Sequence, residues 1–411
     1  MKSLFPKLIL IATSSLLTLF VVDRVISFFP ETKNASSQVT YPPFMNENIR
    51  EHPTVSYTLR TNRLGIRYKD IPLEKENPQE IRVAVIGDSY TEGQGVEEDQ
   101  TFSALLEKKF QSAGNPVFFI NCGISGAGPF EHLRLLKEVA LLYHPDKVIL
   151  AIYANDIDDA MVSGSDPVVR SPIKEKIEKV LPQIYPRVRY LYRNVLHNAF
   201  RYLQRSATSH RFLTAYEDEF LLDLWSLAGD LGIERTKFDE WIRSAPRDAF
   251  TDPERKWFWN HRFGVLDSKV SYLNDCQDSL DGSCQKKWLT LRGSLNEFMK
   301  ECALHHVKPA VLYLPYAPQY DHDYLSPYEY FFEVSDRNRL YKKTKLEENL
   351  ETWAEEKNIP FLDLTEDFRE ASHTSAEPLN LRFDEHWNAR GHKVAAGAIG
   401  KWLEEIHFLD R

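Results

Sequence analysis

Continuous, mostly apolar runs of four to six residues recur along the chain, separated by segments in which apolar residues repeat every three or four positions. Such runs are typical of strands buried on both faces of a parallel sheet, and the longer repeat predicts amphipathic helices. The predicted strands are residues 81–86, 117–120, 147–152, 309–314 and 360–364, and the predicted helices are residues 101–110, 130–143, 345–357 and 389–406. This alternation predicts a flavodoxin-like, doubly wound α/β domain with a parallel five-stranded sheet.

The alternation stops between the third and fourth predicted strands. Residues 161–300 instead have a helical and aromatic pattern, which predicts a large helical insertion with Trp225, Trp241, Trp257, Trp259 and Trp288. The predicted organisation is an N-terminal segment (1–30), a tether and lead-in (31–80), the first part of the α/β domain (81–160), the insertion (161–300) and the second part (301–411). Within the lead-in, residues 62–65 predict the turn of a small hairpin over residues 57–67.

The N-terminal segment has the pattern of a membrane anchor or signal. Lys2 and Lys7 precede an apolar stretch over residues 8–22, and apolar residues continue after two charged positions. We expect an uncleaved anchor, with a cleaved secretory signal as the alternative and a buried helix of a cytosolic protein as a third interpretation. The two lysines predict a single-pass protein of the cell membrane, with its domain on the periplasmic or extracellular side; a cleaved signal predicts secretion.

Composition and charge narrow the choice of partners and cofactors. A net charge of −9 argues against a nucleic-acid partner, and no histidines or cysteines have the spacing of zinc ligands. An arginine-rich stretch over residues 185–205 is interpreted as a solvated helix face, or alternatively as a contact with an anionic glycan or lipid surface. Cys276 and Cys284 have spacing suited to a local disulfide, whereas Cys122 and Cys302 are expected to be small buried residues.

Polar residues that could perform chemistry follow several of the predicted strands. Ser89 follows the first strand and Gly126 the second, and Asn155 follows the third; Asp384 and His386 lie in a late loop. Carboxyl ends of parallel strands meet at one edge of a sheet, so these residues are expected to lie together. A serine hydroxyl needs a histidine base, a carboxylate orients the histidine, and amide donors stabilise an oxyanion.

Four sequence blocks carry a resemblance to a known family. They are Gly-Asp-Ser-Tyr-Thr-Glu-Gly (87–93), Asn-Cys-Gly-Ile-Ser-Gly (121–126), Tyr-Ala-Asn-Asp (153–156) and Asp-Glu-His-Trp-Asn (384–388). In this order they resemble the SGNH, or GDSL-type, serine esterases and acyltransferases, and outside the insertion the resemblance extends over residues 81–400. It implies the SGNH hydrolase fold and no cofactor or metal.

The resemblance also implies roles for individual residues. Ser89 is the implied nucleophile, and its amide joins Gly126 and the Asn155 side chain in an oxyanion hole. Gly126 is preferred to Gly123 as the backbone donor. His386 is the implied base and Asp384 the implied orienting acid.

One feature of the last block departs from the common family pattern. The common position of the acid, three residues before the histidine, is occupied by Phe383. Asp384, two residues before His386, resembles an Asp-x-His-Trp subset of exported, glycan-acting members. Glu385 is expected to point elsewhere. If Asp384 does not orient His386, a backbone carbonyl is the alternative partner.

These observations predict a serine hydrolase that cleaves an ester, most plausibly an O-acyl (acetyl) group on a carbohydrate. An O-acyltransferase acting on a cell-envelope or secreted polysaccharide is the first alternative, because both reactions share the acyl-enzyme. A non-catalytic glycan-binding or assembly protein on the same fold is the second. The predicted partners are an ester-bearing substrate and, through the N-terminal helix, the membrane.

Overall fold

The computed structural model describes residues 39–52, 55–114, 116–162, 234–244, 282–321, 343–381 and 386–410. Every described residue belongs to one compact unit, residues 39–165 with 227–411. The predicted anchor (1–30), the arginine-rich stretch (185–205), Cys276 and Asp384 all lie outside the described residues.

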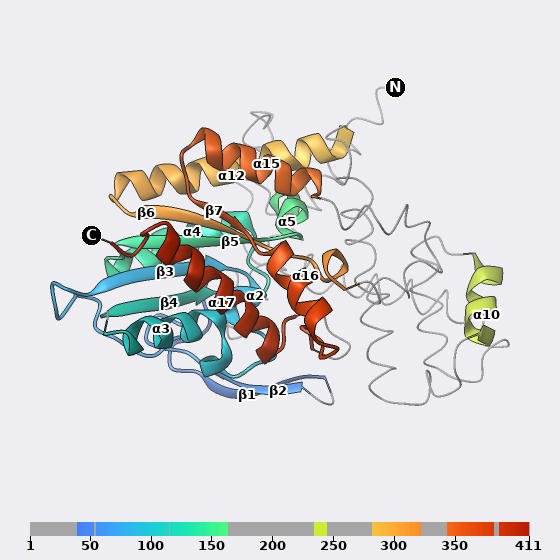
Figure 1. Ribbon diagram of the computed structural model, residues 1–411, viewed down its shortest axis with the longest axis horizontal. Coiled ribbons are helices and arrows are strands. Elements are labelled where there is room, and N and C mark those ends of the chain that lie inside the picture. Colours follow the sequence, from blue (N-terminus) through green and yellow to red (C-terminus); the bar gives the residue numbers. More distant parts are fainter. Residues whose placement is uncertain are drawn as a thin grey trace, which may run out of the picture. The chain divides into compact units, whose positions relative to one another are not determined.

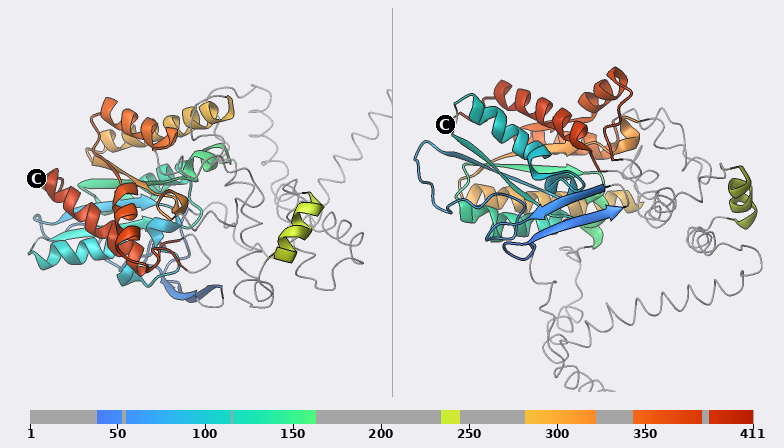
Figure 2. Two further views of the ribbon diagram at one scale, coloured as in Figure 1. Left: turned by 45° about the vertical axis from the view of Figure 1, so that its right-hand side comes forward. Right: turned by 90° about the horizontal axis from the view of Figure 1, so that it is seen from below.

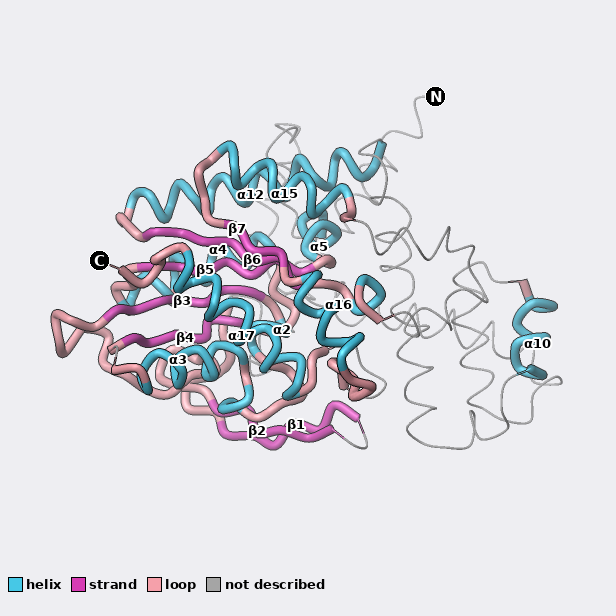
Figure 3. Tube along the Cα trace, in the orientation of Figure 1, coloured by secondary structure: helices cyan, strands magenta, loops and turns pink. Residues whose placement is uncertain are grey.

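The centre of the described unit is a five-stranded parallel sheet, which confirms the predicted fold class (Figures 1 and 3). Its strands are β3 (Ile81–Gly87), β4 (Val117–Gly123), β5 (Lys147–Tyr153), β6 (Lys308–Leu314) and β7 (Phe361–Asp363), in the spatial order β4-β3-β5-β6-β7. β5 is buried along its whole length, as expected for a strand covered by helices on both faces. The strand order reverses between β3 and β5, and ligands of open α/β sheets bind at such a switch point.

Helices cover both faces of the sheet (Figure 2). On one face, α3 (Phe102–Ser112) packs against α17 (Ala389–Glu405), and α17 also contacts α16 (Thr365–Thr374). On the other face, α12 (Gly282–Leu304) packs against α4 (Pro129–Glu138) and α5 (Asp156–Val162). α15 (Lys345–Glu356) lies against α12, where Trp353 Nε1 donates to Asn296 Oδ1 at 3.0 Å. The sheet is therefore the middle of three layers.

The helix predicted over residues 130–143 is shorter in the structure. α4 ends at Glu138, and a 3-10 turn, η2 (Ala140–Tyr143), completes the segment. Within that turn the Tyr143 carbonyl accepts a hydrogen bond from the buried Arg82 guanidinium at 2.9 Å. Tyr143 ends the segment, where a carbonyl has no intrahelical donor, so this acceptor is left for Arg82.

α12 begins inside the segment predicted as the insertion but packs on the sheet. It contacts β6 as well as α4 and α5, and its buried side chains include Trp288, Leu291, Leu295, Phe298 and Cys302. The helix that leads into β6 is thus part of the α/β domain rather than the insertion. Between α5 and α12 the structure also describes α10 (Arg235–Ser244).

The cysteine predictions can be followed only in part. Cys284 is disulfide-bonded, while its predicted partner lies outside the described residues. Cys122 and Cys302 are buried free thiols, as predicted.

The hairpin predicted over residues 57–67 is wrong. β2 (Val55–Arg60) forms an antiparallel pair with the strand that precedes it in the chain, β1 (Asn46–His52). Residues 62–65 do form a turn, in which the Asn62 side chain accepts from the Leu64 amide at 2.9 Å. This turn packs against the preceding segment: a Cβ on Gly65 would lie 2.0 Å from the Tyr41 carbonyl oxygen. The course of the chain at this turn is therefore determined by the contact of Gly65 with Tyr41, which precedes β1, and not by a second strand after the turn.

Neither a membrane span nor a metal site is found within the described ranges. No helix there is both long and apolar enough to cross a bilayer, and no cluster of three or more His, Cys, Asp or Glu side chains could hold a metal ion.

Candidate active site

Ser89 begins a tight turn directly after β3. A Cβ on Gly87 would lie 2.2 Å from Thr91 Oγ1, so only glycine lets the chain fold back so closely. Asp88 caps the short helix α2 (Ser89–Glu92) by accepting from the Tyr90 amide at 2.9 Å. Ser89 is therefore the first residue of a helical turn, where backbone amides have no intrahelical acceptor.

His386 lies beside Ser89 although 297 residues separate the two positions. Its Nε2 is 2.8 Å from Ser89 Oγ, within hydrogen-bond distance of the hydroxyl. The His386 carbonyl accepts from the Leu381 amide at 2.8 Å, which holds the backbone of its loop. The structure thus brings together two of the predicted site residues, a hydroxyl and an imidazole.

The residues after His386 anchor it to the core. Trp387 is fully buried, stacks on Phe368 with ring centroids 4.5 Å apart and meets the Tyr90 ring edge-on at 5.3 Å. Asn388 caps α17 by accepting from two backbone amides, at 2.9 Å and 3.1 Å. The buried indole and the helix cap that directly follow His386 therefore fix the backbone that carries the imidazole.

The predicted orienting acid cannot be placed, because Asp384 lies outside the described residues. Asp88, adjacent to the serine, is fully buried, and this burial raises the pKa of its carboxyl group to about 6; the positive charge of His386 acts in the opposite direction. A buried carboxyl close enough to sense the imidazole charge therefore lies next to Ser89.

Gly126 occupies a second turn, after β4. The Ala127 amide donates to the Ile124 carbonyl at 3.0 Å and closes the turn, with Gly126 in the left-handed region at φ +73°. Gly126 is exposed, and a Cβ there would meet nothing within 4 Å. Gly123, by contrast, packs directly on α2, since a Cβ there would lie 2.2 Å from the Glu92 nitrogen. The two glycines therefore serve different purposes, packing at Gly123 and turn conformation at Gly126.

Asn155 occupies the corresponding position after β5. Its carbonyl accepts from the Asp158 and Asp159 amides, both at 2.9 Å, while the Asp156 carboxylate accepts from the Tyr153 amide at 2.8 Å. The Asn155 Oδ1 atom is buried and has no hydrogen-bond partner among the described residues. The turn is thus held by backbone contacts and by Asp156. Within the described part of the chain, the Oδ1 atom of Asn155 takes no part in holding it.

Two features near Ser89 were not singled out from the sequence. Tyr90 stacks on Tyr153 at 4.1 Å, and their hydroxyl groups lie 2.9 Å apart, which joins the first and third blocks. Glu92 is fully buried, and its carboxylate accepts from the Ser125 amide at 2.6 Å. The sequence signal for Glu92 was a charged residue, between Thr91 and Gly93, within a motif whose other residues are buried.

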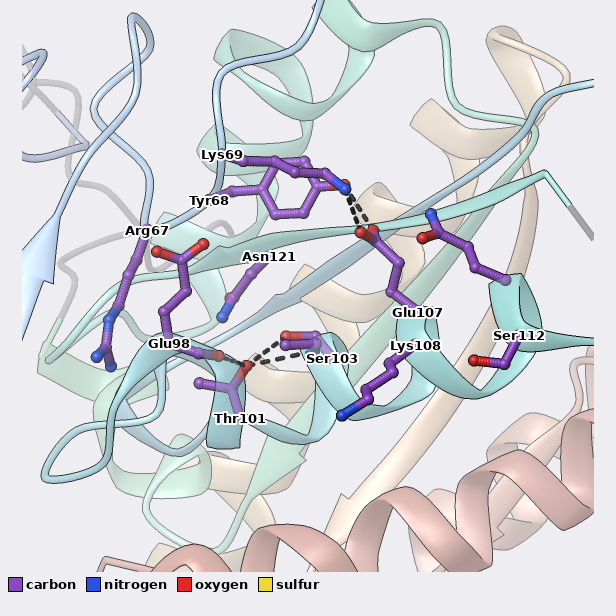
Figure 4. A pocket seen from close by; sticks show the side chains of 12 residues that line it. Arg67, Tyr68, Lys69, Glu98, Thr101, Ser103, Glu107, Lys108, Ser112 and Asn121 are labelled. Atoms are coloured by element: carbon purple, nitrogen blue, oxygen red, sulfur yellow. Dashed lines mark hydrogen bonds and ion pairs between the residues drawn. The ribbon is translucent and has the colours of Figure 1, made fainter.

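A polar pocket of about 380 Å³ lies elsewhere in the domain (Figure 4). Neither Ser89 nor His386 lines it. Its wall includes Glu107, which accepts from the Tyr68 hydroxyl at 2.6 Å and from the Phe119 amide at 2.9 Å. β4 is an edge strand, so Glu107 satisfies a backbone donor that would otherwise be unpaired.

One known protein family matches part of the chain in sequence. Residues 85–261 match the sequence model of the GDSL-like Lipase/Acylhydrolase family, a range that includes the first three blocks and not the last. No curated protein matches the chain.

Several solved structures resemble the chain weakly. The esterase EstA from a Pseudoalteromonas species is 12% identical and has a TM-score of 0.33, with 79% of this chain and 98% of that one covered. A GDSL-like lipase from Bacteroides thetaiotaomicron is 11% identical (TM-score 0.32; 79% and 88% covered). The acetylxylan esterase Axe2 from Geobacillus stearothermophilus is 13% identical (TM-score 0.35; 79% and 94% covered).

Because these TM-scores are low, the family assignment rests on the sequence match. Residues 85–261 therefore match a GDSL-like lipase/acylhydrolase domain, which indicates an ester-bond hydrolase.

Proposed function

We propose that the protein cleaves its ester through an acyl-enzyme on Ser89, with His386 as the general base. The observation that carries this proposal is the 2.8 Å separation of His386 Nε2 and Ser89 Oγ. A general base must lie within about 2.6–3.2 Å of the group whose proton it takes. The hydroxyl needs such a base, because serine is a weak nucleophile in its protonated form.

In the acylation step, Ser89 Oγ attacks the ester carbonyl carbon and its proton passes to His386 Nε2. The resulting oxyanion accepts hydrogen bonds from the amides of Ser89 and Gly126 and from the Asn155 side chain. Collapse of this intermediate breaks the bond to the alcohol oxygen, which takes the proton from His386. Asp384, as orienting acid, stabilises the imidazolium that forms in between.

In the deacylation step, a water molecule replaces the alcohol. His386 takes a proton from that water as it attacks the acyl carbon, and the second tetrahedral intermediate uses the same donors. Its collapse releases the carboxylic acid and returns the proton to Ser89 Oγ. A sugar hydroxyl in place of water would give acyl transfer, so the two reactions differ only in the acceptor.

For the substrate, we propose an O-acyl group, most plausibly acetyl, on a carbohydrate. The support comes from the sequence: the aromatic residues of the insertion suit sugar faces, and the predicted anchor would hold the domain at the cell surface, where glycans are abundant. The proposed location is the periplasmic or extracellular side of the membrane.

The test compares Ser89→Ala with the parent on p-nitrophenyl acetate and on an acetylated polysaccharide. Ser89→Ala should lower kcat by at least about 10⁴-fold, while Ser112→Ala, at an exposed serine at the end of α3, should behave as the parent. Acetate release shows hydrolysis, and acetyl groups recovered on an added sugar show transfer. A Ser89→Ala protein as active as the parent would rule out the proposed mechanism.

A further inference from the structure

Glu92 connects the two turns that follow β3 and β4. It is the last residue of α2, three positions after Ser89, and its side chain is fully buried. Its Oε2 atom accepts from the Ser125 amide at 2.6 Å, and Ser125 immediately precedes Gly126. The turn is also held by the Ala127–Ile124 backbone bond and by the Ser125 hydroxyl, which donates to Gln94 Oε1 at 2.9 Å, while a Cβ on Gly126 would meet nothing within 4 Å. Of these contacts, the bond to Glu92 is the one from the backbone amide next to Gly126 to a buried carboxylate.

The lead-in holds Glu92 in turn. The Tyr41 hydroxyl donates to the same Oε2 atom at 2.7 Å. Burial, followed by the nearby Glu92 charge, raises the pKa of Tyr41 above its usual value, so the hydroxyl keeps its proton and remains a donor. Two donors thus converge on one carboxylate oxygen, and one of them comes from a residue 51 positions earlier in the chain.

A second lead-in residue holds the backbone of the same helical turn. The buried Arg67 guanidinium donates to the Gly93 carbonyl at 2.7 Å and to the Val96 carbonyl at 2.6 Å, and it reaches the Glu92 carbonyl at 3.3 Å. Charge-assisted bonds of this kind to carbonyls are among the stronger hydrogen bonds in proteins. The position of Glu92 is therefore determined from both ends, at its backbone by Arg67 and at its carboxylate by Tyr41.

We propose that Glu92 is a positioning residue for the oxyanion hole: held by Tyr41, it orients the turn that carries the Gly126 amide. The inference rests on the proposed function, in which Gly126 is an oxyanion donor. It also makes the lead-in, residues 39–70, a working part of the hydrolase domain rather than a tether.

The domain contains a matched control for this arrangement. Glu107 is also buried, and it too accepts from a tyrosine hydroxyl and a backbone amide, those of Tyr68 and Phe119, in the pocket of Figure 4. It differs in its additional ion pair with Lys69. Removing Glu92 leaves two donors without an acceptor, and removing Glu107 leaves the same kind of pair together with Lys69, so both losses should destabilise the fold. Only the loss of Glu92 should alter the oxyanion hole.

The readout is the ratio of kcat/KM for p-nitrophenyl acetate to that for p-nitrophenyl thionoacetate, whose sulfur accepts hydrogen bonds poorly. All variants are measured well below their unfolding midpoints. Glu92→Ala should lower kcat for the acetate about 10- to 100-fold with little change in KM, and should lower the ratio about 10-fold, since a misplaced donor loses part of its effect. Tyr41→Phe should lower the ratio less, and Glu92→Gln, which keeps an acceptor oxygen, should retain most of it.

Glu107→Ala and Tyr68→Phe should leave the ratio unchanged. If Glu92→Ala does not fold, the pair Tyr41→Phe and Tyr68→Phe decides the question. An unchanged ratio in the Glu92 or Tyr41 variant, or an equal fall in the Glu107 or Tyr68 variant, overturns the inference alone, provided that Ser89→Ala is inactive. A Ser89→Ala protein with parental activity on both esters overturns the proposed function and this inference together.

Discussion

The turns after β3 and β4 lie side by side yet are held in opposite ways. The nucleophile turn is buried and closed by its own residues: Asp88 caps it, and Gly93, at φ +85°, ends it with a bond to the Ser89 carbonyl at 3.0 Å. The Gly126 turn is exposed and is closed by one backbone bond. Its neighbour Ser125 depends on Glu92 for an acceptor.

The proposed oxyanion hole would therefore combine two turns of unequal rigidity. The proposed nucleophile must be held at a defined angle, and the cap and the terminating bond that do this lie within seven consecutive residues, with Arg67 adding bonds at the end of the turn. A donor on a second strand must be held relative to the first, which local sequence cannot do. A side chain of the rigid turn therefore provides the acceptor that fixes the open one.

The largest expected effect is at Gly123, where the two turns meet. Gly123→Ala would place a Cβ 2.2 Å from the Glu92 nitrogen and 2.6 Å from the Thr91 carbonyl carbon, so backbone must move. We expect the free energy of unfolding to fall by about 3 kcal/mol or more. Gly126→Ala adds no contact. It should lower the free energy of unfolding by only about 1 kcal/mol, because alanine adopts the left-handed conformation less readily than glycine. Urea denaturation measures both, and equal losses would contradict the contrast between a packed and an open glycine.

The turn after β5 extends the comparison to the third predicted donor. Asn155→Ala should lower kcat/KM for an acetyl ester about 10²- to 10³-fold, the usual effect of losing one oxyanion donor. Stability should change little, because Asp156 and the backbone hold this turn. Asn349→Ala, at a half-buried asparagine on α15, is the control. Parental kcat/KM in the Asn155 variant would remove this residue from the oxyanion hole.

A pH-dependent effect on stability sharpens the description of the turn at Ser89. Burial raises the pKa of Asp88 from its usual 3.8 to about 6, so the folded protein binds this proton more tightly than the unfolded chain. The stabilisation that the folded state gains from the protonated Asp88 is therefore complete below pH 3.8 and is lost as the pH rises through 6. Over this range the free energy of unfolding falls by up to about 1.4 kcal/mol per pH unit.

Asp88→Asn keeps an acceptor for the Tyr90 amide but does not titrate. Between about pH 4 and pH 6 its free energy of unfolding should fall less steeply than that of the parent. Some slope should remain, because burial also raises the pKa of Asp159 to about 6. Denaturation curves across this pH range provide the measurement, and parallel curves for parent and variant would contradict the raised pKa of Asp88.

Much of the fold could be predicted from short-range patterns. Each continuous apolar run became a strand, and the Gly87–Gly93 block contains its own cap, its own tight glycine and its own terminator. Errors arose where distant contacts decide. Residues 57–60 pair with β1 rather than with the segment after the turn, and α12 shares the helical pattern of the predicted insertion but is buried on the sheet.

The sequence by itself determined the order of the candidate site residues along the chain. A serine, a glycine and an asparagine each follow a predicted strand, and a histidine comes late in the chain. Turn conformation and helix capping depend on a few consecutive residues, so they can be predicted from the sequence without knowledge of the fold. Only the tertiary structure decided that His386 reaches Ser89 and that Tyr41 reaches Glu92, across 297 and 51 positions. Hydrogen bonds between distant residues depend on how the layers pack, and packing is a property of the whole core rather than of any segment.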